Sequence, residues 1–226
     1  MGNAFGSSGR IPNQTEAAVI DILREAIQKQ PNLDDLQSLS HCFSISSSVE
    51  WKSKLGFQNE DPLKDIRGGG SLAVANLTHY CEDARFGPEA KAIAARRSHR
   101  DDGANYPFAT AAVNITRALA VLFEVVTAGG NVKPDLEHTR KTYWGLLVSG
   151  VDSHDALGGY NAVFSLFFLL LDHTFTEMKA GYMDFPTVLK ATQKKFEVKL
   201  SQCEVEGSAS LVELERLVRT ETEQKS

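Results

Sequence analysis

A long apolar stripe limits what this chain can fold into more than any other feature of the sequence. Between Pro107, which suits a helix start, and Gly129-Gly130, which suits a helix end, apolar side chains recur every three or four residues. We therefore expect a helix with one buried face. Its members are Phe108, Ala112, Ile115, Leu119, Leu122 and Val126. Asn114 and Arg117 lie off the stripe, and Asn114 suits either a bond to a nearby loop or a contact with a partner.

Similar periodicity, bordered by residues that start or stop helices, recurs along most of the chain. The first helix should bury Val19, Ile22, Leu23, Ala26 and Ile27. No strand-like alternation of useful length appears, and no Asn-Gly or Asp-Gly turn joins two strand-like runs. We therefore predict an all-α, irregular multi-helix bundle. Helices are expected to begin at Asp61-Pro62, Pro134 and Asp184. The other expected helices cover Thr15 to the residue before Pro31, Asp34 to Leu39, Trp51 to Leu55, Ser71 to Cys81, Pro88 to Arg97, Pro107 to Gly129, Tyr160 to Lys179 and Leu211 to Val218.

Composition narrows the class of protein. The 226 residues are 42% hydrophobic and 23% charged, which fits one domain with tails and a sizeable core. The net charge of −5 lacks the basic excess of a nucleic-acid binder, so we expect no nucleic-acid partner. Three cysteines, Cys42, Cys81 and Cys203, are far apart in the sequence, which favours free thiols in a reducing compartment.

The amino terminus and the most apolar run bear on localisation. No apolar region of a secretory signal follows Met1, and the run from Ala162 to Leu171 is about half of what a membrane span needs. We therefore expect a cytoplasmic protein in which that run is a buried helix. The first residues resemble an N-myristoylation start with Gly2 as acceptor, although Gly6 stands where Ser or Thr is preferred. One acyl chain would give weak, reversible membrane association, and the alternative is an unmodified, disordered tail.

The stretch from Trp51 to Leu77 carries the most local information. Trp51 and Leu55 share one helix face, Gly56 should stop that helix, and Phe57 is placed to pack back on its last turn. Asp61 can cap a second helical turn with Pro62 at its first position. Ser71 can cap the next helix, whose apolar stripe is Val74, Leu77 and Cys81.

Arg67 is the candidate functional residue of that stretch. Three glycines, Gly68 to Gly70, follow it and leave little side-chain cover. A guanidinium in such a place suits a phosphate or a carboxylate of a partner. The alternative is that Arg67 pairs with Asp65 and that the glycines form a simple turn.

No complete active site is recognisable elsewhere. No Gly-Lys-Ser/Thr follows Gly68–Gly70, and the spacing of His79 and Cys81 does not suit zinc, so we expect neither a cofactor nor a metal. The basic run from Arg96 to Arg100 is interpreted as a solvated helix end, with a rim contact to an acidic partner as the alternative. His173 is interpreted as a core or edge side chain.

The spacing in this stretch resembles the signature of the ELMO domain. The pattern is W-x3-L-G-F-Q-x3-P-x2-D-I-R-G-x-G, carried by Trp51, Leu55, Gly56, Phe57, Gln58, Pro62, Asp65, Arg67, Gly68 and Gly70. A second block, Tyr106-Pro107-Phe108-Ala109 with Asn114-Ile115-Thr116, resembles another segment of that family. The similarity implies an ELMO domain at 51–200. Composition predicts a disordered tail at 1–13, and helical patterns predict a helical extension at 14–50 and an amphipathic helix with a polar tail at 201–226.

The chain is most similar to stand-alone ELMO-domain proteins, and this implies a GTPase-activating protein for GTP-bound Arf or Arf-like GTPases. Arg67 matches the arginine of the family motif and would be the finger, with Asp65 orienting it and the glycines letting two backbones approach. Leu55, as the resemblance implies, would brace this platform together with Trp51 and Phe57. Gln58 is expected to tie the loop down, with a contact to the partner as the alternative. Gly69 and Ser71 depart from the bulky apolar residues usual in the family.

The alternative is a non-catalytic adaptor. Larger ELMO proteins are partners of Dock-type exchange factors for Rac, and they carry a carboxy-terminal PH domain and a proline-rich tail. No proline follows Pro186 here, and the sequence has no counterpart of those parts. We therefore expect an activator rather than an adaptor that binds a small GTPase or a Dock-type factor.

Overall fold

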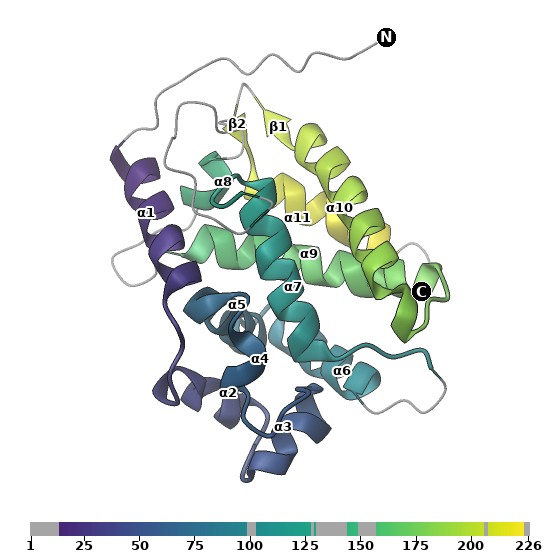
Figure 1. Ribbon diagram of the computed structural model, residues 1–226. Helices are drawn as coiled ribbons and strands as arrows, with labels where there is room; N and C mark the ends of the chain where they lie inside the picture. The colour runs from purple at the N-terminus through teal and green to yellow at the C-terminus, as the bar shows by residue number, and fades with distance from the viewer. Residues whose placement is uncertain are drawn as a thin grey trace.

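The computed structural model describes residues 14–98, 103–127, 129, 144–148, 157–205 and 208–223, and these are mostly helical (Figure 1). The all-α prediction is therefore confirmed. In chain order the elements are α1 (Gln14–Gln28), the 3-10 helix η1 (Asp34–Leu36), α2 (Gln37–Cys42), α3 (Ser48–Leu55), α4 (Leu63–Ile66), α5 (Gly70–Glu82), α6 (Gly87–Ser98), α7 (Phe108–Leu122), α8 (Trp144–Val148), α9 (Gly158–Glu177), the 3-10 helix η3 (Tyr182–Asp184), α10 (Phe185–Gln202), β1 (Glu204–Val205), β2 (Ser208–Ala209) and α11 (Leu211–Glu223).

Helix α9 is the centre around which the others pack. Every side chain from Tyr160 to Leu171 is buried, as expected for a helix that is apolar on all sides. Helices α5, α7, α8, α10 and α11 all contact it. Aromatic contacts join α5, α7 and α9: the ring of Phe168 stacks on that of Tyr80 at 5.1 Å and lies tilted to that of Phe108 at 4.9 Å between centroids. No helix in the described ranges combines the length and the apolar character needed to cross a membrane.

Helix α1 buries a face slightly different from the predicted one. Ile20 is fully buried in the core, whereas Ile22 is 37% exposed, so the assignment of Ile22 to the apolar stripe was wrong. Val19 and Leu23 are buried as expected. Helix α1 contacts α5 and α8 and contributes to the same hydrophobic core as the helices that follow.

Helix α7 ends earlier than its apolar stripe predicts. The amide of Glu124 donates to the carbonyl of Val121, and Glu124 takes a left-handed conformation with φ of 59°. The chain then turns back, and the amide of Val126 donates to the carbonyl of Ala120. Val126 is therefore buried by this reversal rather than by the helix, which explains why periodicity overestimated the helix by several residues.

A short two-stranded sheet was not predicted, and one expected helix lies mostly outside the described ranges. Strands β1 and β2 form an antiparallel pair in which Glu204 faces Ala209 and Val205 faces Ser208. Strands of two residues are too short to show an alternating pattern. The helix expected to open at Pro134 lies mostly among residues that the structure does not describe, although Leu147 on α8 is buried.

Candidate functional site

The loop that carries Arg67 begins where α3 ends. The side chain of Glu50 accepts hydrogen bonds from the amides of Ser46 and Ser47, closing a capping box at the start of α3. The bond from the Ser46 amide, together with Lys54, lowers the pKa of Glu50 to about 2, so the cap is charged at neutral pH. At the other end Gly56 takes the left-handed conformation predicted for a helix stop, with φ of 71°.

Gly56 also brings the two motif segments together. A Cβ atom added to Gly56 would lie 2.8 Å from the Cα of Pro107, which precedes α7. Only glycine therefore fits there without displacing the neighbouring backbone. The predicted packing of Phe57 is present, because its ring lies 5.7 Å from that of Trp51 in an edge contact. Leu55 is also buried and belongs to the hydrophobic core.

Asp65 has a role other than the expected one. Its carboxylate accepts hydrogen bonds from the amide of Gln58 at 2.6 Å and from the amide of Asn59 at 3.0 Å. The side-chain amide of Asn59 donates to its second oxygen. The expectation that Asp65 orients Arg67 was therefore wrong, because the carboxylate is already used to hold residues 58 and 59. Gln58 ties the loop through its backbone, while its side chain is exposed.

Arg67 lies at the carboxyl end of α4 with its side chain exposed to solvent. The residue before it, Ile66, is buried in the core, and Pro62 at the start of the turn is buried as well. Within the described ranges the guanidinium of Arg67 makes neither a hydrogen bond nor an ion pair. The backbone at this point is anchored while the charged group remains free.

The glycine segment is pressed against α1 rather than left open. Gly70 is buried with φ of 60°, and an added Cβ would lie 2.4 Å from the carbonyl oxygen of Ile27. The amide of Ser71 donates to the carbonyl of Lys29, and its hydroxyl donates to that of Ala26. The predicted helix cap by Ser71 was therefore wrong, since its hydroxyl binds α1. The close backbone approach at Gly70 is made within the molecule.

Gly68 stays exposed, and a second arginine lies over it. A Cβ added to Gly68 would be 3.3 Å from Nη1 of Arg117 and 3.6 Å from a methyl of Val113, both on α7. Arg117 is exposed and, like Arg67, has no hydrogen bond or ion pair among the residues that the structure describes. Sequence reasoning placed Arg117 off the apolar stripe of α7 but gave it no role, because periodicity cannot show which loop a helix face meets.

Tyr106, the first residue of the second motif, is buried and takes part in a polar cluster. Asp172 on α9 accepts hydrogen bonds from Arg97 Nε at 2.6 Å and from the hydroxyl of Tyr106 at 2.8 Å. Burial raises the pKa of Tyr106, so its phenol stays protonated and donates. The guanidinium of Arg97 also lies over the ring of Phe175, 4.8 Å from its centroid. The interpretation of Arg97 as solvated was therefore wrong, because a buried partner on α9 was not apparent from the local basic run.

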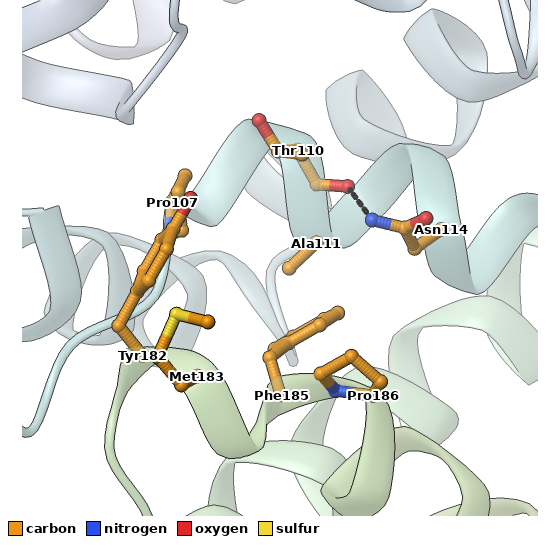
Figure 2. A pocket seen from close by; sticks show the side chains of 8 residues that line it. All are labelled: Pro107, Thr110, Ala111, Asn114, Tyr182, Met183, Phe185 and Pro186. Carbon is orange, nitrogen blue, oxygen red and sulfur yellow. Dashed lines mark hydrogen bonds between the residues drawn. The ribbon is translucent and has the colours of Figure 1, made fainter.

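An apolar pocket lies on the other flank of α7, between this helix and the segment of η3 and α10 (Figure 2). It has a volume of about 240 Å³. Asn114 is at its edge and donates a hydrogen bond to the carbonyl of Thr110, so its side chain bonds within α7 itself. Met183 is 84% exposed and Tyr182 is 49% exposed at the pocket rim. The residues that line it are Pro107, Thr110, Ala111, Asn114, Tyr182, Met183, Phe185 and Pro186.

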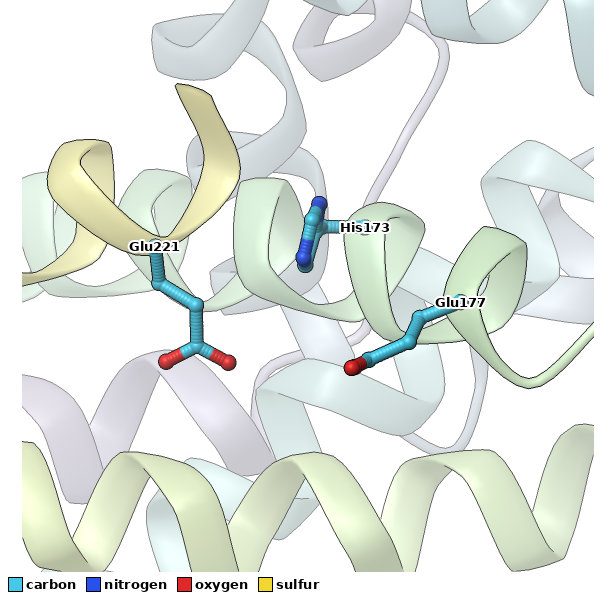
Figure 3. Close-up of side chains that lie close together, drawn as sticks. All are labelled: His173, Glu177 and Glu221. Atoms are coloured by element: carbon cyan, nitrogen blue, oxygen red, sulfur yellow. The ribbon is translucent and has the colours of Figure 1, made fainter. Parts of the chain in front are cut away.

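One group of side chains has the composition of a metal site. Figure 3 shows Glu221 of α11 near His173 and Glu177 of α9, and their ligand atoms lie within 4.8 Å of one another. Lys195 Nζ, however, lies 2.6 Å from Glu177 and 2.8 Å from Glu221, and Lys199 Nζ binds the other oxygen of Glu221. Because ammonium groups already neutralise these carboxylates, we assign the group to an ion-pair network between α9, α10 and α11.

Comparison of the sequence with known proteins shows the family to which the chain belongs. The model of the ELMO/CED-12 family matches residues 13–189, which include α1, the Arg67 loop and the second motif. The chain is 30% identical to ELMO domain-containing protein C of Dictyostelium discoideum over 175 residues, covering 74% of this chain and 26% of that protein. It is 29% identical to ELMO domain-containing protein B of the same organism over 160 residues, covering 70% of this chain and 46% of that protein.

A human protein is similar over a shorter region. The chain is 30% identical to human ELMO domain-containing protein 2 over 103 residues, covering 42% of this chain and 33% of that protein. The chain thus spans less than half the length of each of these three relatives.

Proposed function

Because this chain belongs to the ELMO/CED-12 family, we propose that it is a GTPase-activating protein for small GTPases of the Arf and Arf-like class. The observation that carries the proposal is the state of Arg67. Its guanidinium is exposed at the end of an anchored helical turn and has no partner within the part of the chain that the structure describes. It is thus available to an anionic group on another protein.

A single arginine is enough for this function, since the rest of the site belongs to the GTPase. The GTPase holds the nucleotide, the Mg²⁺ ion and the glutamine that orients the attacking water. An inserted guanidinium binds the charge that develops on the γ-phosphoryl oxygens in the transition state. Such an arginine increases the rate by ~10³–10⁵, which corresponds to about 4–7 kcal/mol of the barrier.

The structure supports the proposal by the way it holds the backbone of Arg67. Asp65 fixes residues 58 and 59, Ile66 is inserted in the core, and Gly70 packs against the end of α1. The turn is therefore held from three directions while the side chain is free. A preorganised backbone reduces the conformational entropy lost when the guanidinium is fixed in a complex.

The experiment is single-turnover GTP hydrolysis across a panel of Arf and Arf-like GTPases, with wild type, Arg67→Ala and Arg67→Lys. We expect stimulation of at least one GTPase by wild type and its loss in both variants, because lysine keeps the charge but lacks the planar fork. Undiminished stimulation by Arg67→Lys would exclude Arg67 as the finger. Binding of a GTP-loaded GTPase or a Dock-type exchange factor without any acceleration would indicate the adaptor instead.

We also propose that the protein acts in the cytoplasm and associates reversibly with membranes through an acyl chain on Gly2, which lies outside the described residues. Its support is the resemblance of the first residues to an N-myristoylation start. Intact-mass measurement after co-expression with an N-myristoyltransferase should show one added myristoyl group that Gly2→Ala lacks. An unmodified wild-type mass under those conditions would contradict the proposal.

A further inference from the structure

The outward face of α7 lies between Arg67 and the apolar pocket. Thr110, Asn114, Arg117 and Val121 follow one another at intervals of four, three and four residues, which places them on one side of the helix. All four are at least partly exposed. In Figure 1 this helix runs between α4 on one side and α10 on the other.

The two flanks of this face carry different chemistry. On one flank, Val113 and Arg117 meet Gly68, the residue directly after Arg67. On the other flank, Ala111 and Asn114 line the pocket together with Met183. Helix geometry thus places a cationic edge and an apolar edge on opposite sides of one ridge.

The cationic edge has no carboxylate partner within the described part of the molecule. Arg67 and Arg117 are both exposed there, and neither has a carboxylate partner among the described residues. Lys64 on α4 is also exposed. Like charges held near one another favour the approach of an anion, although the whole chain carries a net charge of −5. The edge therefore suits a partner that presents a phosphate and acidic side chains together.

The apolar edge suits an anchoring side chain of the same partner. Met183 and Tyr182 are large apolar residues with exposed side chains, and they border a pocket of about 240 Å³. A flexible methionine at the rim can adapt to a bulky side chain, and buried apolar or aromatic anchors are typical of interface centres. Figure 2 shows the pocket open between the two segments that line it.

The distances allow one small protein to cover both edges. Arg117 lies seven residues after Thr110, which is about 10 Å along a helix. A standard interface covers ~800 Å² on each partner, a patch roughly 30 Å across. A domain whose anionic site engages Arg67 would therefore extend over α7 to the pocket.

We propose that the outward face of α7 is the docking surface for the GTP-bound GTPase, with Arg117 binding a second anionic group of that GTPase and the pocket receiving one of its apolar side chains. This inference rests on the proposed function, because its occupant is the GTPase that Arg67 serves. Arg117 and Met183 contribute to binding, whereas Arg67 contributes to the rate of the bound complex.

The test separates these contributions in the full chain. The rate of single-turnover GTP hydrolysis is measured against activator concentration, using the Arf-family GTPase that wild type stimulates. The variants are Arg117→Glu and Met183→Asp, and the matched controls are Lys194→Glu on α10 and Val212→Asp on α11, both exposed away from the pocket lining. Urea unfolding of each variant checks that the fold is retained.

We expect Arg117→Glu and Met183→Asp each to raise the half-saturating concentration about tenfold or more, as for a central interface contact, with little change in the rate at saturation. The controls should stay within about twofold of wild type. Arg67→Lys should lose the saturating rate and still bind.

Several results would overturn the inference. If both variants match their controls while Arg67→Lys still abolishes the rate, the proposed function stands and the docking surface lies elsewhere. If wild type forms a dimer that Met183→Asp dissociates without changing stimulation, the face joins two copies of this chain. If wild type stimulates no GTPase of the panel and binds none, the proposed function fails and the docking surface fails with it.

Discussion

At the scale of single residues, different side chains of the Arg67 loop have different roles: Asp65 holds the loop, and Arg67 is exposed on it. Asp65 was expected to orient Arg67, but its carboxylate accepts hydrogen bonds from the backbone of Gln58 and Asn59. Local sequence can place an acid near an arginine, but it cannot show which amide groups the fold brings closer. The consequence is that Asp65 supports Arg67 indirectly, through the conformation of the loop.

We expect Asp65→Asn to destabilise the protein by about 2 kcal/mol, because it removes the negative charge and puts an NH₂ group in place of an oxygen that accepts from Gln58 or Asn59. Asp61→Asn on the same loop is the matched control. It accepts a hydrogen bond from the amide of Leu63, and losing its charge should cost less than ~1 kcal/mol. Urea unfolding measures both. Equal stabilities of Asp65→Asn and wild type would show that this carboxylate does not hold the loop.

At the scale of elements, contacts between distant segments decide the shape of the site. Gly56 after α3 touches Pro107 before α7, and Gly70 at the start of α5 touches the end of α1. Neither contact can be predicted from helical periodicity, because that pattern describes one segment of the chain at a time. The glycines themselves were visible in the sequence, but the neighbour that each one accommodates was not.

Gly56→Ala and Gly103→Ala provide a matched test of the contact with Pro107. Both glycines have positive φ, at 71° and 77°, but an added Cβ at Gly103 meets nothing within 4 Å. We expect Gly103→Ala to cost about 1 kcal/mol for its backbone conformation alone. Gly56→Ala should cost about 3 kcal/mol because overpacking is added. Similar unfolding free energies for the two variants would contradict a tight contact between the motif segments.

A second comparison tests the ion pair that joins α6 to α9. Arg96 and Arg97 both contact Asp172, but the Arg96 side chain is 43% exposed and that of Arg97 only 3%. We expect Arg97→Leu to cost about 3–5 kcal/mol, because it removes the buried partner of Asp172. Arg96→Leu should cost less than about 1 kcal/mol, as for an exposed pair. Thermal or urea unfolding that ranks the two variants in the opposite order would exclude this assignment.

Helices with strong periodicity were predicted well, and their ends and partners less well. The segments around Val74 and from Tyr160 onward form the expected helices because burial of one apolar face is a local pattern. The end of α7 at Leu122 depends on a chain reversal that buries Val126, and the burial of Arg97 depends on Asp172, far away in the sequence. Both are tertiary effects that outweigh local propensity.

At the scale of the whole molecule, the carboxy-terminal helices are held to the centre by alternating charges. Lys195 of α10 binds Glu177 of α9 and Glu221 of α11, and Lys199 adds a second bond to Glu221. Burial alone would raise the pKa of Glu221, but the hydrogen bonds from these two lysines outweigh it and lower the pKa. The network therefore makes the stability of the molecule depend on pH.

The sign of that dependence follows from the lowered pKa. Glu221 stabilises the fold fully above the pKa of an unfolded glutamate, about 4.3, and its contribution is lost as the pH falls through the lower folded value. We expect the unfolding free energy of wild type to decrease between about pH 5 and pH 3. In Glu221→Gln this decrease should be smaller, while Glu223→Gln, exposed on the same helix, should behave like wild type. Parallel pH profiles for Glu221→Gln and wild type would contradict the prediction.

The family and the position of Arg67 were accessible from the sequence, because a fixed spacing of many residues identified the loop. The second arginine, the pocket and the ridge of α7 between them were not, because they arise where separate helices meet. The parts of the surface on which the proposed docking face rests are therefore visible only in the assembled molecule.

The most direct test of the central claim is single-turnover GTP hydrolysis by an Arf-family GTPase at saturating concentrations of wild type and Arg67→Lys. Binding of the same GTP-loaded GTPase is measured in parallel. We expect Arg67→Lys to bind like wild type and to lose at least about a thousandfold of the stimulated rate. Stimulation by Arg67→Lys equal to that of wild type would contradict the role of Arg67 as an arginine supplied to the GTPase.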